Sequence, residues 1–129
     1  MNSSVSVAKI AELLDLKNFT DEIDLKKRKI TTTDINRPAL QLTGYFEHFE
    51  ESRVEIIGNV EYAYIQQMSD EEKRIRYDAF LKFDIPCVIF SRNLTPDPIF
   101  LKEALANQVP VLGTGRSTSE FTAELIYTL

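Results

Sequence analysis

The side chains best suited to chemistry in this sequence follow three short apolar runs. They are an asparagine, two arginines, three hydroxyl residues and a flexible glycine: Asn59, Ser91, Arg92, Thr114, Gly115, Arg116 and Ser117. An arginine can hold a phosphate or carboxylate through two parallel N–H groups. A helix that begins near Ser117 would add the positive end of its dipole. These residues predict an anion-binding site, and the open alternative is that they are ordinary caps and turns with surface arginines.

The three apolar runs are expected to be strands, because each is short and bounded by turn residues. They are Val54–Ile57, 87–90 and 109–112. Helical patterns separate them, and this alternation predicts parallel strands joined by right-handed crossovers. In such sheets ligands bind beyond the carboxyl ends of the strands, where the residues named above lie. The predicted fold class is α/β, with a mostly parallel sheet between flanking helices.

Five helices are predicted from apolar residues three or four positions apart. Their inner faces are expected to be Val7, Ile10, Leu13 and Leu14; Val60, Tyr64 and Met68; Ile75, Ala79 and Phe83; Leu101, Ala104 and Leu105; and Phe121, Leu125 and Leu129. Three of them have predicted caps, which are Ser69 with Glu72, Thr95, and Ser117 with Glu120. In the third helix, Glu71, Lys73, Arg74 and Lys82 are expected to face water.

The remaining segments carry weaker signals. Lys17-Asn18 is expected to break the first helix, and residues 29–31 to form a short strand. Pro38 is suited to the first turn of a short helix, and Gly44 to its end.

Catalytic and metal-binding residues are not predicted. His48 is the single histidine and no nucleophile motif surrounds it, while Cys87 is the single cysteine and lies in an apolar run. The pair Gly113 and Gly115 lacks the third glycine of the dinucleotide-binding fingerprint, and no P-loop motif occurs. Metal-ligand motifs are also missing from the sequence.

Length and charge limit the class of protein. A chain of 129 residues suits a single domain over residues 1–129, and no linker divides it. The formal net charge of −5 argues against a nucleic-acid or anionic-membrane partner. The basic run at residues 26–29 follows acidic residues, and is interpreted as a solvated segment or a contact surface. No apolar stretch is long enough for a membrane span and no secretory signal is evident, so a cytoplasmic location is expected.

A family resemblance is carried by residues 34–46, which read Asp-Ile-Asn-Arg-Pro-Ala-Leu-Gln-Leu-Thr-Gly-Tyr-Phe. The stretch includes Asn36, Arg37, Pro38 and Gly44. It resembles the signature of the amino-terminal domain of the HPr kinase/phosphorylase family, in which Asp-[Ile/Leu]-[Ser/Asn]-Arg-Pro-Gly leads into Gly-[Tyr/Phe]-Phe. Residues 53–58 with Glu61, 86–94, 109–112 and 117–119 resemble later blocks of the family. Ala39 replaces the usual glycine, and Glu120 stands where many relatives carry arginine.

The resemblance implies a parent enzyme that phosphorylates a serine of HPr, a phosphocarrier protein, and removes that phosphate by phosphorolysis. Such enzymes use ATP or pyrophosphate with magnesium, form hexamers and govern carbon catabolite repression. Their P-loop lies in a carboxyl-terminal kinase domain that residues 1–129 do not include. The last helix is still in register at Leu129, so a truncated longer protein is expected at least as much as a natural end.

This chain is therefore expected to be a non-catalytic regulatory or assembly domain, with no cofactor of its own. Its expected partners are its own kinase domain, HPr and further copies of itself. The fold implied is similar to the substrate-binding domain of Mur ligases and to DRTGG modules, so a module that senses a phosphorylated metabolite is the alternative. Pro38 and Arg37 are predicted either to set local structure, with Arg37 bonding backbone carbonyls, or to line an interdomain surface.

Overall fold

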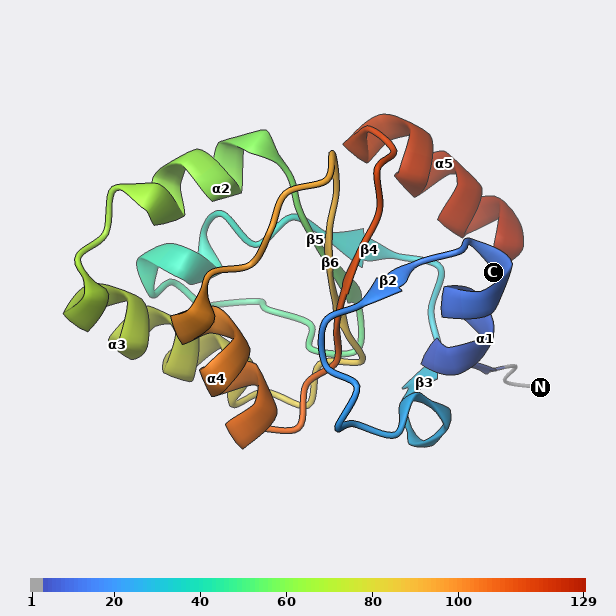
Figure 1. Cartoon of the computed structure of the whole chain (residues 1–129), viewed down its shortest axis with the longest axis horizontal. Coiled ribbons are helices and arrows are strands. Elements are labelled where there is room, and N and C mark those ends of the chain that lie inside the picture. Colours follow the sequence, from blue (N-terminus) through green and yellow to red (C-terminus); the bar gives the residue numbers. More distant parts are fainter. Residues whose placement is uncertain (1–3) are drawn as a thin grey trace.

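In the computed structural model, which describes residues 4–129, a central sheet lies between two layers of helices (Figure 1). The sheet contains β2 (Lys17–Asn18), β7 (Val111–Gly113), β6 (Val88–Phe90), β5 (Val54–Ile57) and β4 (Ile35–Asn36), in that spatial order. The pairs from β4 to β7 are parallel, and β2 joins β7 in antiparallel orientation. The predicted mostly parallel α/β fold is confirmed.

Helices cover both faces of the sheet. They are α1 (Val7–Leu13), α2 (Asn59–Gln66), α3 (Asp70–Leu81), α4 (Pro98–Ala106) and α5 (Thr118–Thr128). Figure 1 shows α1 and α5 together at one side, and α2, α3 and α4 at the other. Two short 3-10 helices, η1 (Leu25–Lys27) and η2 (Gln41–Thr43), and a small antiparallel pair, β1 (Val5–Ser6) with β3 (Lys29–Ile30), complete the described chain.

Two apolar clusters fill the spaces between the layers. Residues of β5, β6 and β7 alternate between them, because successive side chains of a strand point to opposite faces. Ile57, Val88 and Phe90 pack towards α2, α3 and α4. Ile56 and Ile89 pack towards α1 and α5. All three strands are fully buried, as their continuous apolar sequences predict.

Helix α1 ends before Lys17-Asn18, as predicted, but the strand that these residues form was not predicted. These residues form β2, in register with Gly113 and Leu112. The turn behind them is held by polar contacts, since Asn18 Oδ1 accepts a hydrogen bond from Thr20 N at 2.9 Å and Val111 N donates to Thr20 Oγ1 at 3.0 Å. A strand of two residues is too short to show an alternating pattern, and β4 was missed for the same reason.

The predicted inner face of α2 is wrong for Val60 and Tyr64, whereas Met68, just after the helix, is buried as predicted. Glu61 and Ile65 are buried, whereas Val60 is 68% exposed and Tyr64 lies near the surface. An apolarity pattern places a glutamate outside. Here the carboxylate of Glu61 is buried because Arg37 and the amide of Gly58 donate hydrogen bonds to it.

Helix α3 is rotated relative to the predicted stripe of Ile75, Ala79 and Phe83. Its buried residues are Tyr77, Phe80 and Leu81, and Ile75 is 58% exposed. Tyr77 can be buried because its hydroxyl donates to Asp97 Oδ2 at 2.7 Å. Lys73, which was predicted to face water, is only 12% exposed, and its Nζ lies 3.6 Å from the same carboxylate oxygen.

Asp97 rather than Thr95 caps α4, by accepting a hydrogen bond from Phe100 N at 2.8 Å. The buried positions of α4 are Phe100 and Ala104, and the predicted Leu101 and Leu105 are partly buried. In α1, Leu13 is exposed and the other predicted positions are buried.

The two predicted capping boxes differ in outcome. In α5 both halves form, between Ser117 and Glu120. In α3 only one of the two hydrogen bonds of a capping box is present among the described residues: Ser69 Oγ accepts from Glu72 N at 3.1 Å. Within residues 4–129, no helix combines the length and the hydropathy needed to cross a bilayer.

The rotated face of α3 can be tested with two truncations. Phe80→Ala should lower the free energy of unfolding by about 3–5 kcal/mol, because it leaves a cavity in the core. Ile75→Ala should change it by less than about 0.5 kcal/mol, because Ile75 lies on the surface. Urea unfolding followed by circular dichroism measures both. The opposite order of effects would contradict the observed face.

Candidate functional site

Polar residues gather at the carboxyl edge of the sheet. Each parallel strand leads into one of them: Arg37 follows β4, Gly58 follows β5, Ser91 follows β6 and Thr114 follows β7. Because the strands are parallel, these residues share one edge. The sequence predicted this for the ends of β5, β6 and β7, but not for Arg37 after β4.

Glu61 is the central acceptor of this edge. Its Oε1 atom accepts hydrogen bonds from Gly58 N at 2.7 Å and from Arg37 Nη2 and Nε at 2.7 and 3.2 Å. The Glu61 side chain is 4% exposed, so it is desolvated, and its Oε1 atom accepts all three of these hydrogen bonds. The prediction that Arg37 bonds backbone carbonyls is wrong, because Arg37 pairs with this carboxylate. The carboxylate also places a negative charge at the amino end of α2.

Gly58 is where three elements meet. A Cβ atom on this residue would lie 2.6 Å from Thr118 Oγ1 and 2.8 Å from Arg37 Nη2. Next to it, the Ser91 and Thr118 hydroxyl oxygens are 2.7 Å apart, and Ser91 Oγ donates to Ile57 O at 3.3 Å. Ser91, a predicted ligand residue, is thus buried and joins β5, β6 and the start of α5.

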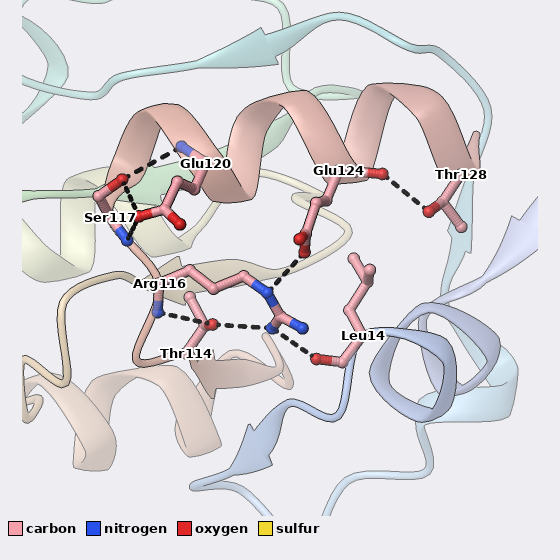
Figure 2. Close-up of polar contacts among 7 residues, drawn as sticks. All are labelled: Leu14, Thr114, Arg116, Ser117, Glu120, Glu124 and Thr128. Carbon is pink, nitrogen blue, oxygen red and sulfur yellow. Dashed lines mark hydrogen bonds and ion pairs between the residues drawn. The ribbon is translucent and has the colours of Figure 1, made fainter.

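Arg116 is engaged within the protein (Figure 2). Its Nη1 donates to Leu14 O at 2.8 Å and to Thr114 Oγ1 at 3.2 Å, and its Nε lies 2.5 Å from Glu124 Oε2. The side chain therefore joins the loop after β7 to α1 and α5. Two of its nitrogens are occupied, which leaves little of the two-pronged grip that an anion would need.

The other predicted ligand residues divide between two places. Asn59 is exposed at the start of α2, and Arg92 is exposed in the loop after β6. Hydrogen bonds from Ser117 lower the pKa of Glu120, and the charge of Arg92 makes a smaller contribution in the same direction. Thr114 and Gly115 instead line a pocket beside β7. The structure therefore does not gather the seven predicted residues around one point. Their binding of an anion stays a prediction.

The family motif builds a turn at the β4 edge. Pro38 is buried, and Gly44 ends η2 with φ +95°, a conformation that favours glycine. Asn36 Nδ2 donates to Gln41 Oε1 at 3.0 Å and to Glu55 Oε1 at 2.7 Å. The motif thus makes structural contacts within this domain, and its part in an interdomain surface stays a prediction.

Glu55 was missed by the sequence analysis, although a charged residue inside an apolar strand is a signal. It is fully buried in β5, and its Oε2 atom has no hydrogen-bond partner within the described residues. Burial raises the pKa of this carboxyl group to about 8, against smaller opposite effects of the Asn36 hydrogen bond and the charge of Arg53.

The two reactive side chains of the sequence lie apart from this edge. Cys87 is fully buried, and burial raises its pKa to about 12, which disfavours the reactive thiolate. His48 is exposed in the loop before β5.

The buried carboxyl group predicts a dependence of stability on pH. Between its ordinary pKa of 4.5 and the folded value of about 8, the folded state holds a proton that the unfolded state has lost. Stability should therefore fall as pH rises through this window. Each pH unit inside it is worth about 1.4 kcal/mol, so the fall from pH 6 to pH 8 is on the order of 2 kcal/mol.

Glu55→Gln should remove most of this fall, because an amide does not ionise. Urea unfolding at several pH values measures it, with the exposed carboxylate variant Glu12→Gln as the matched control. If the unsubstituted chain had the same free energy of unfolding at pH 6 and pH 8, a protonated Glu55 would be contradicted.

The contact of Arg37 with Glu61 predicts a second effect. Arg37→Ala should destabilise the fold by about 1–3 kcal/mol, because a desolvated carboxylate loses its cation. Adding Glu61→Gln should recover part of that loss, since the glutamine oxygen can still accept from Gly58 N. Additive effects in thermal unfolding of the two single variants and the double variant would contradict the pairing.

The comparisons with known proteins point to one family. The family model described as "HPr Serine kinase N terminus" matches residues 5–129. The chain is 42% identical over 123 residues to an HPr kinase/phosphorylase of Lachnoclostridium phytofermentans, covering 95% of this chain and 40% of that protein. It is 39% identical to that of Caldicellulosiruptor bescii (93% and 39% covered), and 33% identical to that of Latilactobacillus sakei (95% and 39% covered).

A solved structure shares the fold. It contains the CBS and DRTGG domains of the regulatory region of a Clostridium perfringens pyrophosphatase, complexed with its activator diadenosine tetraphosphate. The TM-score is 0.60 at 16% sequence identity, covering 94% of this chain and 45% of that one, so the likeness concerns the fold alone. The chain spans about 40% of the length of its curated relatives. By the family match over nearly all its residues, this chain belongs to the HPr serine kinase amino-terminal domain family.

Proposed function

We propose that this chain is the non-catalytic, regulatory or assembly domain of a bifunctional HPr kinase/phosphorylase. The observation that carries the proposal is the family match over residues 5–129, together with relatives of which this chain spans only about 40%. The kinase domain would then lie in the part of the relatives that this chain does not match.

The chemistry at the sheet edge supports a non-catalytic role. An active site needs donors, acceptors or nucleophiles that are free to meet a substrate. Here Glu61 is committed to Arg37 and the Gly58 amide, and the Ser91 hydroxyl is paired with that of Thr118. These polar groups hold secondary-structure elements together.

The parent's properties belong to the same proposal. It would transfer phosphate from ATP or pyrophosphate, with magnesium, to a serine of HPr, and reverse this by phosphorolysis. It would assemble as a hexamer in the cytoplasm and control carbon catabolite repression. ATP and magnesium would bind the kinase domain, and we assign neither to a residue of this chain.

Ligand sensing is a second candidate function, and one observation favours it. A pocket of about 230 Å³ opens beside β7 at the carboxyl edge of the sheet, where ligands of α/β folds bind. A sensing domain and an assembly domain are compatible in one protein.

Phosphate transfer tests the main proposal. The purified chain should give no phosphorylated HPr with ATP and magnesium, while the full-length parent does. The parent without this domain should keep measurable kinase activity, but differ in oligomeric state or in its regulation. Mass spectrometry of HPr and analytical ultracentrifugation measure these outcomes. HPr phosphorylation by the chain alone would overturn the proposal, as would a shortened parent that assembles and is regulated normally.

A further inference from the structure

The pocket beside β7 is built by residues far apart in the sequence. Its walls include Lys17 and Phe19 from the β2 segment, Asn93, Leu94 and Thr95 from the loop after β6, and Gly115 from the loop after β7. We name it the β7 pocket. It lies where the antiparallel β2 joins the parallel strands.

Two glycines allow this pocket to form. A Cβ on Gly113 would lie 2.7 Å from Phe19 Cε2, so the ring packs against β7 in its observed place because residue 113 is a glycine. A Cβ on Gly115 would lie 3.1 Å from both terminal atoms of the Asn93 amide. Asn93 itself has φ +59°, a conformation that asparagine tolerates better than most residues. The Asn93 amide is therefore held against the wall of the pocket.

Three polar side chains of the β7 pocket make no hydrogen bond or ion pair within the described residues: Lys17, Asn93 and Thr95. Lys17 Nζ lies 5.0 Å from the centre of the Phe19 ring. Within the part of the chain that the structure describes, no carboxylate lies within 4 Å of that ammonium group. No hydrogen bond there engages the side-chain amide of Asn93 or the hydroxyl of Thr95, whereas the backbone N–H of Asn93 donates to Thr114 O at 2.9 Å. Asp15 is the acidic residue of the lining, and Phe19 and Leu94 supply apolar surface.

We propose that the β7 pocket binds a compact organic anion. Its phosphate or carboxylate group would meet the ammonium of Lys17 and the amide of Asn93, and its carbon skeleton would lie against Phe19 and Leu94. The volume of about 230 Å³ is below the range of drug-sized ligands, which favours a small metabolite. The inference deepens the sensing candidate, and it rests on the proposed function only for its biological role.

Nuclear magnetic resonance can test the site on the chain as it exists. The ¹⁵N-labelled protein is titrated with glycerol 3-phosphate and, separately, with citrate, at constant ionic strength. Glycerol and sodium chloride are the uncharged and ionic controls. Saturable shifts are expected at the amides of Lys17, Asn93 and Gly115. The compound that binds more tightly identifies phosphate or carboxylate as the preferred group.

Three variants make the test specific. Lys17→Met removes the charge but keeps a long side chain on Phe19, and Asn93→Gly removes the amide but suits the left-handed backbone. Each should weaken binding by about tenfold or more. Lys26→Met removes a charge from η1, outside the β7 pocket, and should leave binding unchanged.

The inference is overturned by shifts that do not saturate, by shifts that sodium chloride reproduces, or by saturable shifts centred elsewhere. Equal weakening by Lys17→Met and Lys26→Met would also overturn it, because general charge attraction would then explain the binding. A failed kinase test would leave this result standing, so the two proposals fail separately.

Discussion

One carboxylate oxygen organises the carboxyl edge of this domain. Glu61 Oε1 accepts hydrogen bonds from the amide of Gly58, just before α2, and from two nitrogens of Arg37, and so ties β4, β5 and α2 together in a desolvated place. A desolvated carboxylate is costly unless it is paired, and removal of Arg37 would leave Glu61 without its cation. Gly58, which must lack a Cβ for Arg37 and Thr118 to approach, is a consequence of the same arrangement.

Much of the layered fold could be predicted from the sequence, because apolar runs and helical spacing reflect burial directly. Val54–Ile57, the last helix and its Ser117–Glu120 box lie where the pattern placed them. The orientation of α2 and α3 could not be predicted in the same way. Their inner faces contain Glu61, Lys73 and Tyr77, whose burial depends on partners that are distant in sequence.

The candidate site shows the same limit. The strand ends were found because chain direction alone brings them to one edge. The contacts of each side chain at this edge could not be predicted. Arg116, for example, contacts Leu14 and Glu124, and no local sequence pattern indicates those contacts. Lys17 and Asn93 were not among the seven predicted ligand residues, because no local pattern indicates that they line one pocket. Lys17 lies in a strand of only two residues. Asn93 lines the β7 pocket because β2 pairs with β7 and completes the pocket.

The pairing of β2 with β7 also bears on how the domain folds during synthesis. The edge of the sheet is closed by residues near the start of the chain against residues near its end, and Thr20 meets Val111 across a separation of 91 positions. Contacts of such long range form late, because a large loop must close first. During synthesis on the ribosome, β2 and Thr20 cannot form these contacts before β7 has emerged. Until then the apolar side chains of this early segment remain open to chaperones and to incorrect partners.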